Sequence, residues 1–349
     1  MYSPKFIISN KILKNISLIE AAREVIINAP LVPAYEKKFR EEAIVRTVHH
    51  GTHIEGNELN IIEASQVLKG QTVVGRDRDI QEVINYRNVL NFLDYVGRGE
   101  VSKGKLTSEV VKKIHALTVE KLLALEKCGV YRNSQVVVKN SVTGEITFRP
   151  PPAIEVPYQV EEFLSWVNTM VKDEIHPVLK AGITHYELVR IHPFVDGNGR
   201  MARASATLVL FLDNYDIKKF FSLEEHYDHD AARYYEALKS AASGDLTNWL
   251  EYFSEGLSIE LTRIKEKVLR LSIDLHLKEK LGGQQVFLSE RQIAIMEYIQ
   301  RVGYLNNQGF EDLFPKISED TILRDLHDLM QKGIIKKEGK TKASRYMLR

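Results

Sequence analysis

The stretch "ITHYELVRIHPFVDGNGRMAR", residues 183–203, decides both the fold and the chemistry expected of this chain. A helical segment leads into a loop where two glycines flank Asn198, so the backbone there must bend sharply or lie against something bulky. A histidine, an aspartate and an arginine occupy the same loop, within residues 191–200. This combination predicts an anion-binding loop between two helices.

The loop and the helix after it suit a polyphosphate. Backbone N–H groups of Gly197, Asn198 and Gly199 would converge at a helix N-terminus, where unsatisfied donors and the helix dipole favour a phosphate. Arg200 and Arg203 are three positions apart, so they share a helical face. Their forked donors suit further phosphate oxygens.

Two further residues supply an acid and a base. Asp196 is a hard oxygen ligand able to hold Mg²⁺ against the same phosphates. Neutral His192 could take a proton from an incoming hydroxyl near neutral pH. A lone histidine before proline, or a lone Gly-Asn-Gly turn, is more often structural. The combination instead indicates transfer of a phosphorus-containing group from a nucleotide to an alcohol.

The segment "HPFVDGNGRMAR" (192–203) resembles the Fic-domain signature His-Pro-Phe-x-Asp/Glu-Gly-Asn-Gly-Arg-x-x-Arg and matches every specified position. "ITHYELVR" is similar to the family's preceding helix, and the resemblance extends less sharply over about residues 35–250. It implies an all-α core with a β-hairpin flap. Family members with this motif mostly transfer AMP from ATP to Ser, Thr or Tyr hydroxyls of proteins and release pyrophosphate.

The resemblance also implies a role for each residue of the motif. His192 would be the general base and Asp196 the Mg²⁺ ligand. The remaining positions would bind the nucleotide: Gly197, Asn198 and Gly199 as the phosphate cradle, Arg200 on the phosphates and Arg203 on the γ-phosphate. The implied cofactors are ATP and Mg²⁺, and the implied partner is a target protein with a hydroxyl side chain. Self-modification and a homodimer are further expectations, since relatives often dimerise through this domain.

The segment "THIEGN" (52–57) resembles the inhibitory helix of self-restrained Fic proteins, Ser/Thr-x-x-x-Glu-Gly/Asn. Glu55 and Gly56 fit, but Gly51 stands where the hydroxyl belongs, so that contact is either absent or supplied by Thr52. Glu55 paired with Arg203 would occupy the cation that the ATP γ-phosphate needs. The alternative is a solvated glutamate, which the dipole disfavours at a helix end. In some relatives this glutamate also helps to remove AMP, and we leave that activity open.

Two other segments resemble parts of the family's site. "TGEITFRPPP" (143–152) resembles the flap that aligns a target segment by strand addition, and the alternative is an ordinary surface hairpin. "ARYYEAL" (232–238) resembles the segment lining the adenine pocket. Tyr234 and Tyr235 are therefore candidates for that pocket, although helical tyrosines are more often core residues.

The remaining pattern predicts a mainly α protein. Helical spacing recurs from Tyr35 to Leu68, with a break at 55–57 and a capping box at Asn60 and Glu63. Further helices are predicted over 79–96, 107–125, 156–173, 177–190 and 199–212, then on to about 280, with β-branched runs in 134–152 predicting a hairpin. We expect four parts: a helical region with the inhibitory helix (1–100), the catalytic core (101–250), a connecting helix and linker with "LGGQQ" (251–283), and a winged helix (284–349).

The winged-helix prediction rests on capped helices at Ser289 and Ser318 followed by a two-stranded ribbon turning at 338–339. A competing function is therefore a DNA-binding regulator whose larger domain senses nucleotide. The ribbon is basic, but the second helix carries four acids against two bases and would meet DNA unfavourably. We favour protein contact or dimerisation for this part. The acids are Glu319, Asp320, Asp325 and Asp328, and the basic residues of the ribbon are Lys336, Lys337, Lys340, Lys342 and Arg345.

The totals exclude several classes of protein. The 349 residues carry a formal net charge of +1, which gives no overall field for nucleic acid. The single cysteine, Cys128, allows no intrachain disulfide and fits a reducing compartment. No signal-like or membrane-spanning apolar run occurs, so we expect a cytoplasmic protein with no membrane partner. The histidine clusters at 48–53 and 224–230 lack well-spaced soft ligands, so no structural zinc is expected.

Overall fold

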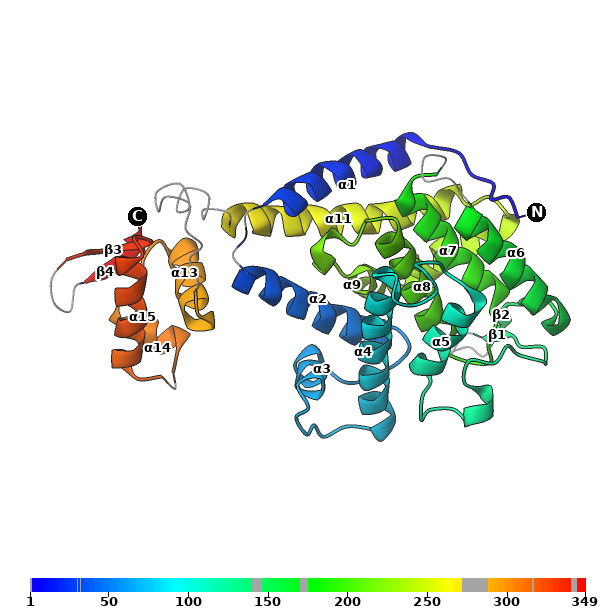
Figure 1. Cartoon of the computed structure of the whole chain (residues 1–349), viewed down its shortest axis with the longest axis horizontal. Coiled ribbons are helices and arrows are strands. Elements are labelled where there is room, and N and C mark those ends of the chain that lie inside the picture. The colour runs from blue at the N-terminus through cyan, green and yellow to red at the C-terminus, as the bar shows by residue number, and fades with distance from the viewer. Residues whose placement is uncertain are drawn as a thin grey trace. The chain divides into compact units, whose positions relative to one another are not determined.

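The computed structural model describes residues 2–29, 31, 33–139, 146–169, 175–271, 288–315, 317–339 and 344–349. The chain is mainly helical, which confirms the predicted fold class (Figure 1). It divides into two compact units, Met1–Glu24 with Glu42–Ile264, and Val25–Glu41 with Lys265–Arg349. The four-part division of the sequence stays a prediction. Among the described helices, none combines the length and apolar character needed to cross a membrane.

Eight helices of the described chain lie between residues 10 and 212. They are α1 (Asn10–Asn28), α2 (Pro33–His53), α3 (Ile61–Leu68), α4 (Asp77–Gly97), α5 (Ser108–Thr118), α6 (Val156–Thr169), α7 (Pro177–Ile191) and α8 (Asn198–Leu212). Next come α9 (Leu223–His229), α10 (Ala231–Ser240) and α11 (Thr247–Leu271). Short 3₁₀ turns lie at Leu125–Lys127, Ala153–Glu155, Ile217–Lys219 and Ala241–Ser243.

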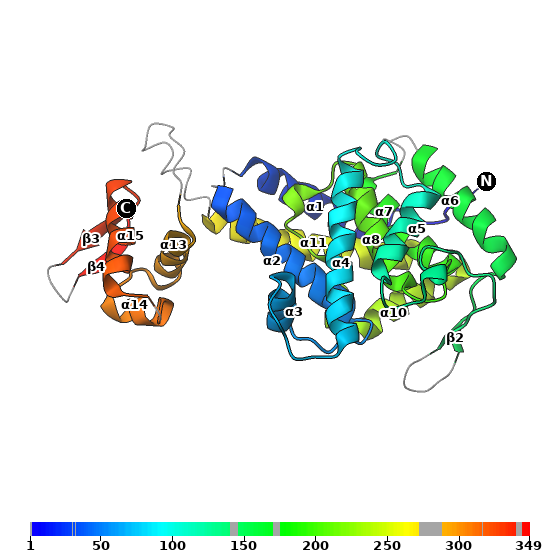
Figure 2. The ribbon, with the colours of Figure 1, turned by 60° about the horizontal axis from the view of Figure 1, so that its bottom comes forward.

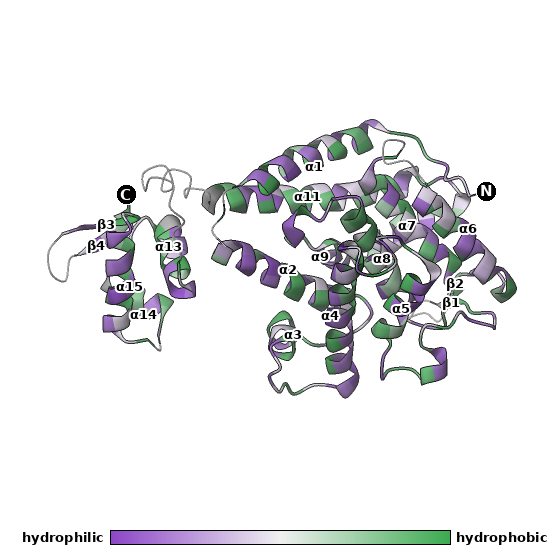
Figure 3. Ribbon diagram, viewed as in Figure 1, coloured by the Kyte–Doolittle hydropathy of each residue, from purple (hydrophilic) through white to green (hydrophobic). Residues whose placement is uncertain are grey.

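Helix α8 is the centre of the larger unit. It packs against α7, α4 and α5, and both ribbon views show it among these helices (Figures 1 and 2). Most side chains of α7 and α8 are buried, as expected of helices with core contacts on several sides. Polar and apolar residues alternate along the outer helices α1 and α11, which gives each an apolar face (Figure 3). The loop between α7 and α8 is therefore held by two rigid core helices.

Local sequence signals fix most helix ends where they were predicted. The capping box at α3 is confirmed, since the Asn60 side chain accepts from the N–H of Glu63 while the Glu63 carboxylate accepts from the N–H of Asn60. The helix predicted to run to residue 125 is wrong, because α5 ends at Thr118. Asn85 of α4 donates its amide to the carbonyls of Thr118 (3.2 Å) and Glu120 (2.8 Å), which takes acceptors that a continuing helix would use.

The predicted hairpin is present as a two-stranded antiparallel sheet. Strands β1 (Val138–Lys139) and β2 (Ile146–Phe148) pair with Val138 opposite Phe148. The predicted turn at 143–144 lies outside the described residues. Residues 170–174, at the end of the helix predicted over 156–173, also lie outside them. The hairpin leaves the helical core beside α6 (Figure 2).

The described residues from 288 to the C-terminus form three helices and a second hairpin. The elements are α13 (Glu290–Val302), α14 (Asn307–Leu313), α15 (Glu319–Gln331), β3 (Ile335–Glu338) and β4 (Arg345–Leu348), with β3 antiparallel to β4. Ser289 caps α13 in a capping box with Gln292. Ser318 stands at the N-cap of α15, but its hydroxyl hydrogen-bonds to the Thr321 hydroxyl at 2.9 Å and caps no N–H. The element order is that of the predicted winged helix, whose identity stays a prediction. The predicted linker at 281–285 and the lysines at 340 and 342 lie outside the described residues.

Candidate active site

His192 sits at the C-terminal end of α7 in a left-handed backbone conformation (φ 51°, ψ 60°). Its N–H donates to the carbonyl of Leu188 at 3.1 Å, which closes the helix. Its ring nitrogen Nδ1 lies 3.2 Å from the carbonyl oxygen of Val189. A carbonyl can only accept, so Nδ1 carries the proton and Nε2 keeps a free lone pair.

The surroundings of His192 favour its neutral form. Burial lowers the pKa of His192, and the charge of Arg132 lowers it further. The Val189 carbonyl and the charges of Glu55 and Asp196 oppose this shift without reversing it. A neutral imidazole with a free Nε2 can accept a proton at neutral pH, as a general base must.

Side chains around the loop hold its backbone in place. The Asn198 amide accepts from the N–H of Phe194 and donates to the carbonyl of Phe194, both at 2.9 Å. Buried His115 accepts from the N–H of Gly129 (2.9 Å) through Nδ1, so its Nε2–H donates to the Asp196 carbonyl (2.9 Å). Its ring also stacks on Phe194 with centroids 3.7 Å apart. Sequence reasoning missed His115, because it precedes the motif by many residues.

Burial lowers the pKa of His115 to about 4. Its ring is therefore neutral throughout the physiological range, which keeps the single N–H that bonds the loop. We regard His115 as part of the scaffold of the loop.

The start of α8 matches the predicted phosphate cradle in shape. Gly197 adopts φ 72°, which glycine tolerates without strain. A Cβ on Gly199 would lie 2.4 Å from Oε1 of Glu55, so a larger residue there would push the Glu55 carboxylate aside. The first N–H groups of α8 have no acceptor within the helix and are available to an anion.

Asp196 is exposed beside this helix start, and its Oδ1 accepts from the N–H of Gly197 at 2.6 Å. A hard oxygen ligand next to a phosphate cradle is a donor that Mg²⁺ accepts. The residues present therefore fit the predicted metal, with Asp196 as the protein ligand.

Arg203 and Glu55 meet directly. Nη2 of Arg203 donates to Oε1 of Glu55 at 2.8 Å and to the carbonyl of Gly51 at 2.9 Å. The Arg203 side chain is only 1% exposed, whereas that of Glu55 is 30% exposed in the turn after α2. The predicted competitor for the γ-phosphate thus occupies the arginine in this structure.

The missing hydroxyl at Gly51 has a steric explanation. A Cβ on Gly51 would lie 2.5 Å from Cε1 of Tyr86, so no larger residue fits without a shift. Tyr86 is itself buried and donates to Oε1 of Glu224 at 3.0 Å. The Thr52 hydroxyl donates to the carbonyls of Val48 and His49 in its own helix (2.9 and 3.0 Å), so it does not replace the missing contact.

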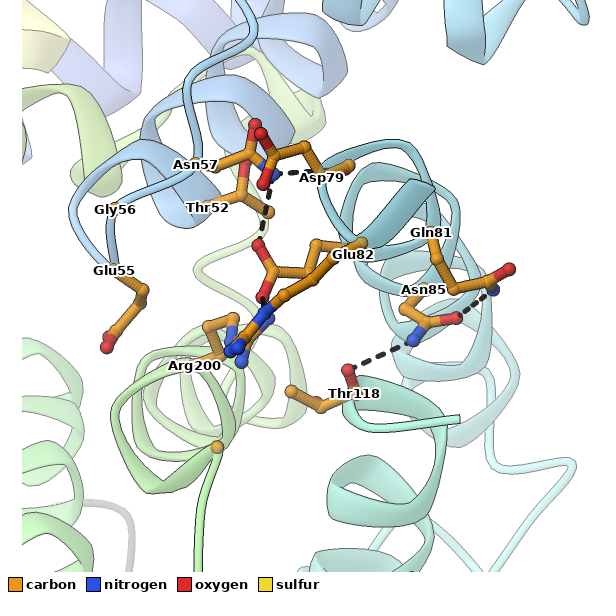
Figure 4. Close-up of polar contacts among 12 residues, drawn as sticks. Thr52, Glu55, Gly56, Asn57, Asp79, Gln81, Glu82, Asn85, Thr118 and Arg200 are labelled. Carbon is orange, nitrogen blue, oxygen red and sulfur yellow. Dashed lines mark hydrogen bonds and ion pairs between the residues drawn. The ribbon is translucent and has the colours of Figure 1, made fainter. Parts of the chain in front are cut away.

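Arg200 points away from Glu55 and pairs with Glu82 of α4 (Figure 4). The distance from Nη1 of Arg200 to Oε1 of Glu82 is 3.2 Å, and both side chains are buried. The contact of Nη1 with Glu82 is an ion pair without hydrogen-bond geometry. Among the described residues, Nε of Arg200 has no hydrogen-bond acceptor either. Its predicted contact with nucleotide phosphates stays a prediction.

Glu82 also holds the turn that carries Glu55. Asn57 donates its amide to Oε2 of Glu82 and to the carbonyl of Asp79, both at 3.0 Å (Figure 4). Arg76 bonds the Asp79 carboxylate (2.8 and 3.0 Å) and the carbonyl of Gly56 (3.0 Å). The residues at the start of α4 therefore hold the turn that carries Glu55. No sequence motif indicated this contact.

The two tyrosines of α10 occupy different environments. Tyr234 is buried, with its hydroxyl 2.9 Å from Nε2 of His185, so it belongs to the core beneath the site. Tyr235 is 50% exposed. Partial burial, together with the charge of Glu55, raises the pKa of Tyr235 to about 12. Tyr235 is thus the better placed of the two for a nucleotide base.

The two histidine clusters meet at one carboxylate. Nδ1 of His50 and Nδ1 of His53 lie 2.7 and 2.8 Å from oxygens of Asp228. Within the described ranges, no group of three or more His, Cys, Asp or Glu residues is arranged to hold a metal ion. The cluster joins α2 to α9.

The protein is mainly helical, with a glycine-containing loop between two core helices, and residues 105–210 match the Fic/DOC family model. Curated relatives named "Protein adenylyltransferase Fic" include one from Drosophila willistoni, 24% identical over 268 residues, which are 74% of this chain and 50% of that protein. Another, from Drosophila grimshawi, is 26% identical over 63% of this chain and 42% of its own length. The chain thus spans half or less of the length of these relatives.

Solved structures show the same fold. A Fic family protein from Desulfovibrio desulfuricans G20 superposes with a TM-score of 0.67 at 23% identity, over 100% of this chain and 98% of that one. A segment of Fic-1 from C. elegans gives a TM-score of 0.61 at 23% identity, over 74% of each chain. The chain carries a Fic/DOC domain.

Proposed function

We propose that this protein is an adenylyltransferase that transfers AMP from ATP to a hydroxyl side chain of a target protein. The observation that carries the proposal is His192, with a free Nε2, directly before an anion-binding helix start that leads to Arg203. The curated relatives bear the name of this activity and support it. An enzyme of this class needs the base, the phosphate cradle and the cation close together.

The reaction follows from these positions. Nε2 of His192 takes the proton of the target hydroxyl as its oxygen attacks the α-phosphorus. A bond forms between that oxygen and the α-phosphorus, and the bond from the α-phosphorus to the bridging oxygen of pyrophosphate breaks. The N–H groups at the start of α8 bind the phosphate oxygens, and Arg203 orients the γ-phosphate. Mg²⁺ held by Asp196 would supply charge neutralisation of the phosphates.

Glu55 restrains the reaction in this proposal. While its carboxylate holds Arg203, the γ-phosphate lacks its cation and ATP binds in an unproductive pose. Glu55 also lies against Gly199, where the phosphates would pass. When the Glu55 carboxylate leaves Arg203, both the arginine and the space beside Gly199 become available to the nucleotide phosphates.

Intact-protein mass after incubation with Mg²⁺ and ATP tests the proposal. The proteins compared are the wild type, Glu55→Gly, and Glu55→Gly combined with His192→Ala. We expect AMP to be gained by the Glu55→Gly single variant alone, with the protein serving as its own target. A wild type that gains AMP equally well would keep the enzyme but remove the restraint. The transfer proposal fails if no variant gains AMP from ATP and none transfers AMP to proteins of a cell lysate.

Three finer proposals accompany this function. The protein modifies itself, it forms a homodimer through the Fic/DOC domain, and Glu55 contributes to removal of AMP from modified targets. Each has a direct measurement: peptide mapping of the modified residue, light scattering, and release of AMP from purified modified protein.

For the C-terminal unit we propose protein contact or dimerisation, with DNA binding as the alternative. The charge argument against DNA is weaker than the sequence alone implied, because Asp325 pairs with Arg291 of α13 (2.6 Å), a base that the count for the second helix did not include. Titration of the full chain with a DNA duplex at several salt concentrations separates the two. Affinity that falls steeply with salt would favour DNA.

A further inference from the structure

Arg132, six positions before β1, is buried and only 3% exposed. Its Nε donates to the carbonyl of His192 at 2.8 Å. Its Nη2 donates to the carbonyls of Pro151 (2.5 Å) and Ile191 (3.4 Å), and its Nη1 to that of Ser134 (3.2 Å). One side chain therefore bonds four main-chain oxygens.

These oxygens belong to two separate segments. Ser134 and Pro151 lie on either side of the β1–β2 hairpin, whereas Ile191 and His192 end α7. The main-chain N–H of Arg132 adds a bond to the carbonyl of Pro193 at 2.9 Å. In the described part of the chain, no carboxylate lies within ion-pair distance of Arg132. Its charge is instead satisfied by carbonyls, including the negative end of the α7 dipole.

The bond to His192 matters because of the backbone conformation there. A left-handed conformation in a residue with a Cβ costs about 1–2 kcal/mol and persists only when the surroundings hold it. The fixed planar fork of a guanidinium can hold the His192 carbonyl and the hairpin ends at set positions, which a lysine cannot do. The direction of the His192 ring follows from its backbone.

We propose that Arg132 is a positioning residue that fixes the β1–β2 hairpin, where a target segment would dock, relative to Nε2 of His192. The proposal rests on the proposed AMP transfer. Arg132 contacts neither Arg203 nor the start of α8 in the described contacts, so it acts on the transfer step and leaves nucleotide binding alone. Loosening it would separate the target hydroxyl from its base.

The test compares Arg132→Lys with Arg190→Lys, both in the Glu55→Gly background. Arg190 is the matched control. It lies near the end of α7, the helix whose last carbonyls Arg132 bonds, but it bonds the side chains of Glu187 (2.8 Å) and Gln159 (3.0 Å). Self-modification with Mg²⁺ and ATP is followed by intact mass, and MgATP affinity by calorimetry. For Arg132→Lys we expect transfer to fall ~10- to 100-fold, the cost of a small misplacement, with unchanged MgATP affinity. The control should keep both.

A second readout does not depend on activity. Amide hydrogen exchange in Arg132→Lys should become faster both in the hairpin strands and at Ile191 and His192, and the control should show neither change. Arg132→Gln replaces Arg132→Lys if the lysine variant does not fold. Unchanged exchange, faster exchange in one segment only, or a loss of MgATP affinity equal to the loss of transfer would overturn the proposal. If the Glu55→Gly parent transfers no AMP, the proposed function fails, and the exchange data alone decide whether Arg132 couples the two segments.

Discussion

The two arginines of the loop helix, Arg200 and Arg203, are each paired with a carboxylate from the N-terminal half of the chain, but the two pairs differ in burial. Glu82 is on a helix, its side chain is 4% exposed, and it also receives bonds from Asn57 and Arg78. Glu55 is on a turn and its side chain is 30% exposed. The two carboxylates are thus held differently, because Glu82 is enclosed together with Arg200, whereas Glu55 is open to solvent on one side even though Arg203 is buried.

The cost of separation explains this difference. Both arginines are buried, so removing either carboxylate uncovers a buried charge, and in a fully buried pair this costs about 3–5 kcal/mol. The Glu55 carboxylate can instead turn to water on its exposed side, and in the proposed mechanism an ATP phosphate takes its place on Arg203, so the cation keeps a partner. The same displacement at Glu82 would break the anchor of the turn as well.

The largest effect is expected from Arg203→Ala in the Glu55→Gly background. The γ-phosphate then loses its cation, and transfer should fall about 10²- to 10³-fold, as for other preorganised donors to a transferring group. The measurement is the initial rate of AMP gain by intact mass. Transfer that persists within threefold of the parent would show that Arg203 serves only as the partner of Glu55.

The next effect concerns stability and tests the comparison directly. Glu82→Gln should lower the free energy of unfolding by about 3 kcal/mol, because Arg200 loses its buried partner. Glu55→Gln, an identical change of chemistry, should cost less, because the new side chain lies where water reaches it and its amide oxygen can still accept from Arg203. Urea unfolding of the two variants gives both values. Equal losses would contradict the distinction between a fixed and a releasable pair.

A smaller effect is expected from Asn57→Ala, which loosens the turn and leaves both carboxylates intact. The variant loses three buried hydrogen bonds, two that the Asn57 amide donates and one that its Oδ1 accepts from the N–H of Leu59, so stability should fall by about 1–2 kcal/mol. AMP transfer should rise above that of the wild type and remain below that of Glu55→Gly, because Glu55 is less well held.

Asn60→Ala is the matched control for this variant. It removes the cap of α3 at a similar cost of about 1 kcal/mol, at a position that does not bond the turn. If both asparagine variants change transfer alike, general destabilisation rather than the turn explains the result.

Much of the fold followed from short-range signals in the sequence. Helix spacing, the capping box at Asn60 and the glycines of the loop act between residues a few positions apart, so a single sequence displays them. The end of α5 was missed for the opposite reason. It is set by Asn85 of another helix, which takes the carbonyls of Thr118 and Glu120.

The site divides in the same way. The loop residues were identified by their motif, and the meeting of Glu55 with Arg203 was expected from the resemblance of residues 52–57 to an inhibitory helix, supported by charge competition. The partners Glu82 and Asn57, the clamp Arg132 and the loop support His115 carried no motif of their own. Their roles arise only when distant segments pack together, so sequence spacing could not indicate them.

The smallest expected effect is on the pKa of His192, and it sharpens the comparison without requiring activity. Burial lowers this pKa most, while the negative charge of Glu55 opposes the shift. Glu55→Gln removes that charge, so the protonated ring loses stabilisation and the pKa should move further down. Glu82 is not among the groups that act most strongly on His192, so Glu82→Gln should shift its pKa less than Glu55→Gln does. NMR titration of the labelled histidines measures both variants. A downward shift confined to Glu55→Gln would show that, of the two carboxylates, only Glu55 acts on the charge of His192. Without the Glu55 charge, His192 would stay neutral to lower pH, and transfer would continue to lower pH as well. An equal shift in the two variants would mean that the carboxylates act on the site as one.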